Sequence, residues 1–286
     1  MNTKYKKNVA SLQKLIRMYR IIICCLLLLL AFVGDVPLAK AQSQEKQWKL
    51  IFSDEFDQPN GSQPDASKWN RHERGNSRWS RWISDVDEVV YIKKGRLICR
   101  AIPNKIAPSD TAKMLTGAIN TKGKFSFKYG KVEVRMRTNL RCGNFPAAWM
   151  VPPSQTTHSY AEIDIMESFG TRREATHTAH TQFTQDNKKH GEKNSFRIPL
   201  DVKKWHVYGV EWDEKQIVWM IDGKVTGIYK KSSDAEKLSK GQWTFDRPFC
   251  LILNQSVGNG NYDFMIPQIS KVYETQFDWI RVYQKK

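Results

Sequence analysis

The amino-acid sequence predicts an all-β fold in which two antiparallel sheets pack as a sandwich. Beyond residue 41, helical periodicity is scarce, and short segments that alternate polar and apolar side chains dominate. Residues 131–137 and 206–212 both show this period of two. Many short strands joined by tight turns are typical of sandwiches and barrels.

One hairpin is expected within residues 216–229. Apolar residues alternate on both sides of the dipeptide Asp222-Gly223. Asp-Gly suits the positive φ angles of a type I′ turn, whose twist matches that of two paired antiparallel strands. The sequence therefore predicts two strands joined at Asp222.

The first 41 residues are typical of a secretory signal peptide. Six Lys or Arg residues precede an apolar run from Ile21 to Val33, and Ala39-Lys40-Ala41 offers the small residues of a cleavage site. The run has 13 residues, whereas a membrane-spanning helix needs roughly 20. We expect cleavage after Ala41, export to the periplasm or the extracellular space, and no stable membrane insertion.

Residues 42–286 are expected to form a single catalytic domain that acts as a monomer. This length is enough for a full hydrophobic core. The three cysteines in it, Cys99, Cys142 and Cys250, are far apart and odd in number. Their spacing is that of neither a disulfide framework nor a metal site. With three cysteines, at most one disulfide bridge can form.

The chain is strongly basic, and its composition restricts the class of partner. The formal net charge is +17 and falls to +11 when residues 1–41, with seven Lys or Arg and one Asp, are removed. Such a surface favours anionic partners. The basic residues are scattered, with no basic helical stripe or finger motif, which argues against nucleic acid. An acidic glycan or simple solubility accounts for the charge.

Three acidic residues stand close together in the segment Ala161–Ser168. Glu162 and Asp164 share one face of a strand because side chains alternate, whereas Glu167 would point away from them. A β-bulge at Ile165-Met166 would bring all three to the same side, and bulges are common beside active sites.

Three carboxyl groups in one cleft suit glycoside hydrolysis. They repel one another when ionised, so at least one holds its proton near neutral pH. Glycosidases use such a set, because one carboxylate attacks the anomeric carbon while a protonated partner donates to the leaving oxygen. Ten Trp and ten Tyr would provide stacking surfaces for sugars. A solvated acidic face or a cation site built from the three acids is the alternative.

The acidic segment resembles the active-site strand of glycoside hydrolase family sixteen, in the branch with the motif Glu-x-Asp-x-x-Glu and a bulge. That branch holds laminarinases, agarases, carrageenases, porphyranases and endo-β-galactosidases. The resemblance continues in order through residues 52–56, 69–70, 130–135, 146–150, 205–208, 211–212, 221–223, 248–254 and 278–283. It implies a jelly-roll sandwich with a concave cleft and a secreted, endo-acting, retaining β-glycosidase that needs no cofactor for catalysis.

The resemblance also implies roles for single residues. Glu162 corresponds to the nucleophile, Asp164 to its hydrogen-bonded helper, and Glu167 to the general acid/base. Trp149 corresponds to the aromatic floor, and His180 to a histidine near the nucleophile. His177 and His180 are three residues apart on a strand, on opposite faces, so they are no metal pair.

Further binding residues follow from the same resemblance. Asn254 ends a matching strand, and Trp79 and Trp82 lie in a loop that would line the cleft. Many family members hold a structural Ca²⁺ far from the cleft, and the matching positions here are Glu55, Gly95 and Asp278.

Two loops depart from the laminarinase pattern and leave the substrate open. Residues 255–262 replace a Gly-Gly-x-Trp-Pro-Gly stretch, and residues 74–82 also differ. A β-1,3 or mixed-linkage glucan and a β-galactan are both compatible. Arg74, Arg78 and Arg81 slightly favour a galactan that can carry sulfate, and the alternative is that these loop arginines are simply solvated. A non-catalytic carbohydrate-binding protein and a transglycosylase are the alternative functions on this fold.

Overall fold

A computed structural model describes residues 47–106, 109–155, 160–186, 193–258 and 260–286. The predicted signal peptide, residues 1–41, lies outside the described residues. The chain divides into two compact units, and nearly all described residues belong to the unit Leu50–Gln284. Within the described ranges, no helix is both long and apolar enough to cross a membrane.

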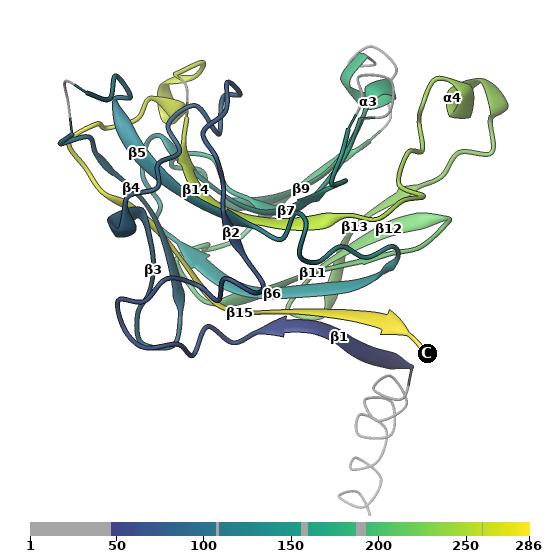
Figure 1. Cartoon of the computed structure of the whole chain (residues 1–286). Coiled ribbons are helices and arrows are strands. Elements are labelled where there is room, and N and C mark those ends of the chain that lie inside the picture. The colour runs from purple at the N-terminus through teal and green to yellow at the C-terminus, as the bar shows by residue number, and fades with distance from the viewer. Residues whose placement is uncertain (1–46, 107–108, 156–159, 187–192, 259) are drawn as a thin grey trace, which may run out of the picture. The chain divides into compact units, whose positions relative to one another are not determined.

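The strands form two layers of antiparallel pairs, which confirms the predicted fold class (Figure 1). One layer has the order β10-β9-β8-β7-β14-β5, with β2 beside β5. Its strands are β2 (Asn70–Arg71), β5 (Met114–Asn120), β7 (Asn144–Val151), β8 (Ala161–Glu167), β9 (Glu174–Thr181), β10 (Ser195–Pro199) and β14 (Cys250–Val257). In Figure 1 this layer lies uppermost and curves upward at both ends.

The second layer has the order β4-β15-β6-β11-β12-β13, with β1 beside β15 and β3 beside β4. Its strands are β1 (Trp48–Asp54), β3 (Val90–Ile92), β4 (Leu97–Pro103), β6 (Gly130–Thr138), β11 (His206–Trp212), β12 (Gln216–Ile221), β13 (Lys224–Lys230) and β15 (Tyr273–Lys285). Pairing of β4 with β5 joins the two layers at one edge. Short helices complete the described part: η1 (Asp87–Val89), α3 (Gln182–Asp186), α4 (Ala235–Ser239) and η3 (Asp263–Met265).

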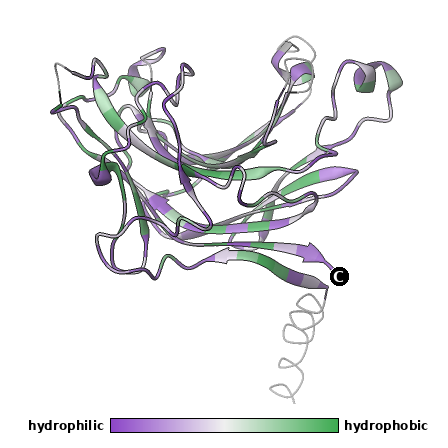
Figure 2. Cartoon of the chain, viewed as in Figure 1, coloured by the Kyte–Doolittle hydropathy of each residue, from purple (hydrophilic) through white to green (hydrophobic). Residues whose placement is uncertain are grey.

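The hydrophobic core lies between the two layers. Strand β6 shows why, because every second residue from Val132 to Met136 is buried while the residues between are half-buried. The alternation of colour along the lower strands in Figure 2 reflects this pattern. Aromatic side chains from both layers, among them Trp219 and Phe249, are fully buried within the same cluster. The curved layer is therefore supported from below, and its upper face is left for a site.

The predicted hairpin is confirmed. Strands β12 and β13 pair in antiparallel fashion around Asp222 and Gly223, whose φ angles are 50° and 76°. The Asp222 carboxylate accepts hydrogen bonds from the backbone N–H of Val207 and from His206 Nδ1, at 2.9 and 2.7 Å. These bonds tie the turn to strand β11. Cys99, Cys142 and Cys250 are all free thiols.

Candidate active site

Strand β8 contains the bulge that the acidic motif predicts. Two residues of β8, Ile165 and Met166, face a single residue on each neighbouring strand. On β7, Ala147 pairs with Glu167 and Trp149 pairs with Asp164. On β9, the partners of Glu167 and Asp164 are two residues apart, whereas the acids themselves are three apart. The extra residue puts Glu167 back in phase with Glu162 and Asp164.

Two side chains bind the backbone of the bulge from the core side, and a third holds one of them. Trp219 of β12 donates its indole N–H to the carbonyl of Asp164 at 2.8 Å. His177 Nδ1 lies 2.6 Å from the carbonyl oxygen of Ile165, and its Nε2 lies 3.0 Å from Thr226 Oγ1. A carbonyl can only accept, so His177 carries its proton on Nδ1 and accepts from the threonine hydroxyl. Burial lowers the pKa of His177 to about 4, which keeps the ring neutral.

The acids meet around Asp164, which is buried at 2 % exposure. Its carboxyl interacts with those of both Glu162 and Glu167. His180 Nε2 lies 3.2 Å from Asp164 Oδ2 and 3.7 Å from Glu162 Oε1. The Tyr160 hydroxyl donates to the other oxygen of Glu162 at 2.6 Å. These contacts place His180 beside Glu162, and His177 lies buried on the opposite face of β9.

Burial and mutual repulsion hold protons on this group. Desolvation raises the pKa of Asp164 well above its ordinary value, and the charge of Glu162 raises it further. Desolvation, followed by the charge of Asp164, also raises the pKa of Glu167 well above its usual range. The raised pKa values of Asp164 and Glu167 favour their protonated forms at mildly acidic pH. Asp164 is placed to donate a hydrogen bond, and Glu167 to give a proton to a ligand.

The acids line a curved face whose floor is aromatic. Trp149 of β7 pairs with Asp164, and its indole N–H donates to Asn254 Oδ1 at 2.8 Å. Trp79 packs edge-on against Trp149, with ring centroids 4.8 Å apart. Asn254 itself is buried, and its amide also donates to Ser256 Oγ at 3.2 Å. Asn254 thus holds Trp149 in place and has little surface to offer a sugar.

Trp82 does not join this floor. It packs against two clusters of the hydrophobic core, and the Arg81 guanidinium stacks over its ring at 4.1 Å. The Arg81 side chain also donates to the carbonyl of Gly258 at 3.0 Å. Of the two tryptophans expected to stack on substrate, Trp79 borders the cleft and Trp82 anchors the loop.

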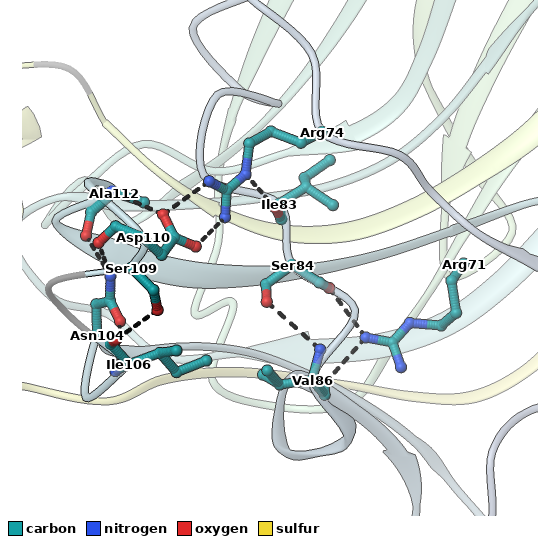
Figure 3. Close-up of polar contacts among 10 residues, drawn as sticks. All are labelled: Arg71, Arg74, Ile83, Ser84, Val86, Asn104, Ile106, Ser109, Asp110 and Ala112. Atoms are coloured by element: carbon teal, nitrogen blue, oxygen red, sulfur yellow. Dashed lines mark hydrogen bonds and ion pairs between the residues drawn. The ribbon is translucent and has the colours of Figure 1, made fainter.

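Arg74 has a structural role in the same loop (Figure 3). Its guanidinium forms a two-pronged ion pair with the Asp110 carboxylate at 2.8 and 2.6 Å, and its Nε donates to the carbonyl of Ile83. This ion pair lowers the pKa of Asp110 to about 2. Arg74 and Arg81 therefore fasten the loop to its surroundings, and Arg78 is the arginine of the three that lines a cavity.

The two carboxylates at the positions that match a structural calcium site make ion pairs instead. The Asp278 carboxylate contacts the guanidinium groups of Arg96 and Arg135. Glu55 forms a two-pronged ion pair with Arg281 at 2.8 and 2.9 Å. Gly95 has a φ of 65° and lies in the turn between β3 and β4. Carboxylates neutralised by arginine do not fit a set of calcium ligands.

Glu162, Asp164 and His180 are close enough together to hold a metal ion. Their ligand atoms lie within 4.8 Å of one another, which is true of no other such group of three among the described residues. A metal ligand must be deprotonated. The raised pKa of Asp164 therefore favours a proton over a cation at this place.

Comparison with known proteins decides the family. Residues 81–254, more than half of the chain, match the family model of Glycosyl hydrolases family 16. The chain belongs to glycosyl hydrolases family 16. The resemblance of the bulged motif to that family is thereby confirmed.

Relatives within family 16 act on different polymers. Keratan-sulfate endo-1,4-beta-galactosidase of Sphingobacterium multivorum is 30% identical over 83% of this chain and 55% of that protein. Beta-glucanase of Rhodothermus marinus is 30% identical over 90% of this chain and 93% of that protein. This chain thus spans about half of the first relative and nearly all of the second.

Solved structures agree with the fold. The laminarinase catalytic domain of Thermotoga maritima superimposes with a TM-score of 0.70 and 28% identity, covering 84% of this chain and 99% of that one. A chain described among endo-acting O-glycanases of the human gut microbiota that initiate mucin breakdown gives a TM-score of 0.66 and 30% identity. It covers 82% of this chain and 98% of that one.

Sequence reasoning missed four residues of this family 16 site. Tyr160 has a local signal, because it lies two positions before Glu162 and thus projects to the same face. His177, Trp219 and Thr226 have none. His177 of β9 and Trp219 of β12 bind the bulge, and Thr226 of β13 binds His177, all through the packing of the two layers.

Proposed function

We propose that this family 16 protein is an endo-acting, retaining β-glycosidase of a polysaccharide or glycan. The observation that carries the proposal is the bulge in β8, which puts Glu162, Asp164 and Glu167 on one face of a curved sheet. Asp164 interacts with both glutamates, so the two lie close together. This favours the separation of about 5 to 5.5 Å of retaining enzymes over the roughly 6.5 to 9.5 Å of inverting ones.

Each residue has a defined part in a double displacement. The Glu162 carboxylate attacks the anomeric carbon while the glycosidic C–O bond breaks and Glu167 gives its proton to the leaving oxygen. Glu167, now ionised, takes a proton from water, whose oxygen attacks the same carbon and releases Glu162. Tyr160 and Asp164 donate hydrogen bonds that orient the nucleophile and stabilise its charge.

The substrate classes that fit are a β-1,3 or mixed-linkage glucan and a β-galactan. Both have support from relatives, because a keratan-sulfate endo-β-galactosidase and a β-glucanase match at the same identity. Trp79, which is half-buried, offers an aromatic surface on which either sugar would stack, and the buried Trp149 supports it edge-on. Export by the N-terminal segment belongs to the same proposal, and N-terminal sequencing of the protein from the medium or the periplasm tests cleavage after Ala41.

Product release from a panel of polymers tests the activity and the nucleophile together. The panel consists of laminarin, mixed-linkage glucan, agarose, porphyran, keratan sulfate and mucin glycans. Glu162→Ala should abolish release, and Glu214→Gln, which changes an exposed residue of the β11–β12 turn, should not. With azide added, Glu162→Ala should form a glycosyl azide of α configuration, which only a lost nucleophile explains. Binding of all polymers with no cleavage would contradict the proposal.

A further inference from the structure

A cavity of about 430 Å³ adjoins the acids, and three arginines line it: Arg78, Arg172 and Arg197. The described residues that line this cavity include no Asp or Glu. Hence three positive charges meet there without a carboxylate in the wall. We refer to it as the arginine pocket.

The arginine pocket is continuous with the catalytic face. Phe169 and Arg197 line both the arginine pocket and the neighbouring cavity, which Glu167 and His180 also line. Strand pairing gives the same placement, because Arg197 pairs with Thr176, which in turn pairs with Glu167. Two strand spacings of about 4.8 Å separate Arg197 from the proposed acid. A chain cleaved at Glu167 would thus reach the pocket within one or two sugar units.

Two of the three guanidinium groups are free to bind a ligand. Arg78 and Arg197 are exposed, and neither makes an ion pair with a described residue. Arg172 is held in place by Glu174 at 3.2 Å and by stacking over the ring of Phe264 at 4.3 Å. The pocket thus combines one fixed guanidinium with two that can close on a ligand.

The remaining walls suit a sugar ring. Phe145 and Phe169 lie with centroids 5.2 Å apart, and Tyr262 stacks on Phe264 at 5.4 Å. Aromatic faces contact the apolar C–H faces of sugars, whereas guanidinium groups bind oxyanions in a two-pronged geometry. A neutral glucan would leave the charges of Arg78 and Arg197 without partners among the described residues, whereas Arg172 already pairs with Glu174.

We propose that the arginine pocket is a subsite for a sugar that carries an anionic group, either a sulfate ester or a carboxylate. This inference rests on the proposed glycosidase function and makes its substrate an anionic polymer. The anion is bound beside the cleaved bond and takes no part in the chemistry. Arg78 and Arg197 set specificity, and Arg172 positions the ring and the anion against Phe264.

The test compares polymers that differ only in charge. The pairs are laminarin with laminarin sulfate, and keratan sulfate with its desulfated form; laminarin oxidised at C6 supplies carboxylate in place of sulfate. Affinity is measured by electrophoresis in polymer-containing gels with Glu162→Gln, so that no polymer is cut, and kcat/KM is measured with the active protein. The test variant is Arg78→Gln/Arg197→Gln, and the control is Arg173→Gln, which removes one exposed charge outside the pocket.

We expect the double variant to lose about tenfold or more in affinity and in kcat/KM for the anionic member of a pair, and less than twofold for the neutral member. Added salt should weaken the wild type more than the double variant. Equal losses on both members, the same loss in Arg173→Gln, or affinity that sulfation leaves unchanged in all pairs would overturn the inference. Charge-dependent binding without any cleavage would retain this inference and refute the glycosidase proposal.

Discussion

His177 Nδ1 lies 2.6 Å from the carbonyl oxygen of Ile165, the residue at which the catalytic strand bulges. The ring is fully buried and stacks parallel to Trp219, whose indole binds the preceding carbonyl, that of Asp164. Two successive carbonyls of the bulge therefore have partners in the core, and the registration of the three acids depends on the packing beneath them.

Replacing His177 with Phe should impair catalysis more than removing the Thr226 hydroxyl, which is the second hydrogen-bond partner of the His177 ring. His177→Phe keeps a ring but leaves the Ile165 carbonyl buried and unpaired, at a cost of about 1 to 3 kcal/mol. We expect kcat/KM to fall about tenfold or more as Glu167 loses its position relative to Glu162. Thr226→Val, which removes only the bond to Nε2, is the matched control. Full turnover in a folded His177→Phe protein would show that the bulge forms without this bond.

The neutral state of His177 predicts lower stability in acid. Its pKa is lowered to about 4 in the folded protein, whereas an unfolded histidine titrates near 6.5. The unfolded chain therefore takes up the proton first, and the free energy of unfolding decreases as the pH falls from about 6.5 to 4, by up to about 3 kcal/mol. Urea unfolding at pH 7 and pH 4.5 measures this. In His177→Phe the decrease should be smaller by that amount, and an equal decrease in both proteins would assign it to other groups.

Asp164→Asn should reduce turnover while leaving the protein folded. The amide keeps the size of the carboxyl, but it changes the hydrogen bonds to Glu162 and Glu167. We expect kcat to fall about 100-fold, within the range for groups that assist proton transfer. Steady-state kinetics with the substrate found in the panel, alongside thermal melting, separate the two effects. An unchanged kcat would remove Asp164 from the proposed machinery.

The raised pKa of Glu167 predicts sensitivity to alkali. Since its folded pKa exceeds its ordinary value, the stabilisation is present below that value and is lost as the pH rises through the folded pKa. Activity should fall over the same interval, because the leaving group needs the proton. The pH profiles of kcat/KM and of the melting temperature check this. Glu167→Gln should melt with a flatter profile on the alkaline side, and a wild-type melting temperature that rises there would contradict the assignment.

Removing calcium should leave the melting temperature unchanged. The carboxylates of Asp278 and Glu55, at the positions expected for calcium ligands, are bound by arginines in the described structure. Thermal melting with EDTA, and then with excess Ca²⁺, measures the effect. A melting temperature that falls in EDTA and recovers with Ca²⁺ would contradict this prediction and support the calcium site that the family resemblance implies. Arg135→Gln should lower the melting temperature, since it removes one of the two guanidinium groups that neutralise the Asp278 carboxylate.

Local patterns were enough to predict the features whose causes are local. Alternation in residues 131–137, the Asp222-Gly223 turn and the spacing of Glu162, Asp164 and Glu167 all follow from side-chain geometry within a few residues. The bulge is the clearest case, because three acids can share one face of a strand only if an extra residue is inserted between them.

Features that depend on distant parts of the chain needed the packed layers. Arg74, Arg78 and Arg81 look alike in the sequence, yet one pairs with Asp110, one lines a cavity and one binds the carbonyl of Gly258. Trp79 and Trp82 also look alike in the sequence, yet Trp79 borders the cleft and Trp82 packs against the core. The register of the strands and the stacking of the two layers decide which side chains meet across the sheets. Residue type alone does not predict either.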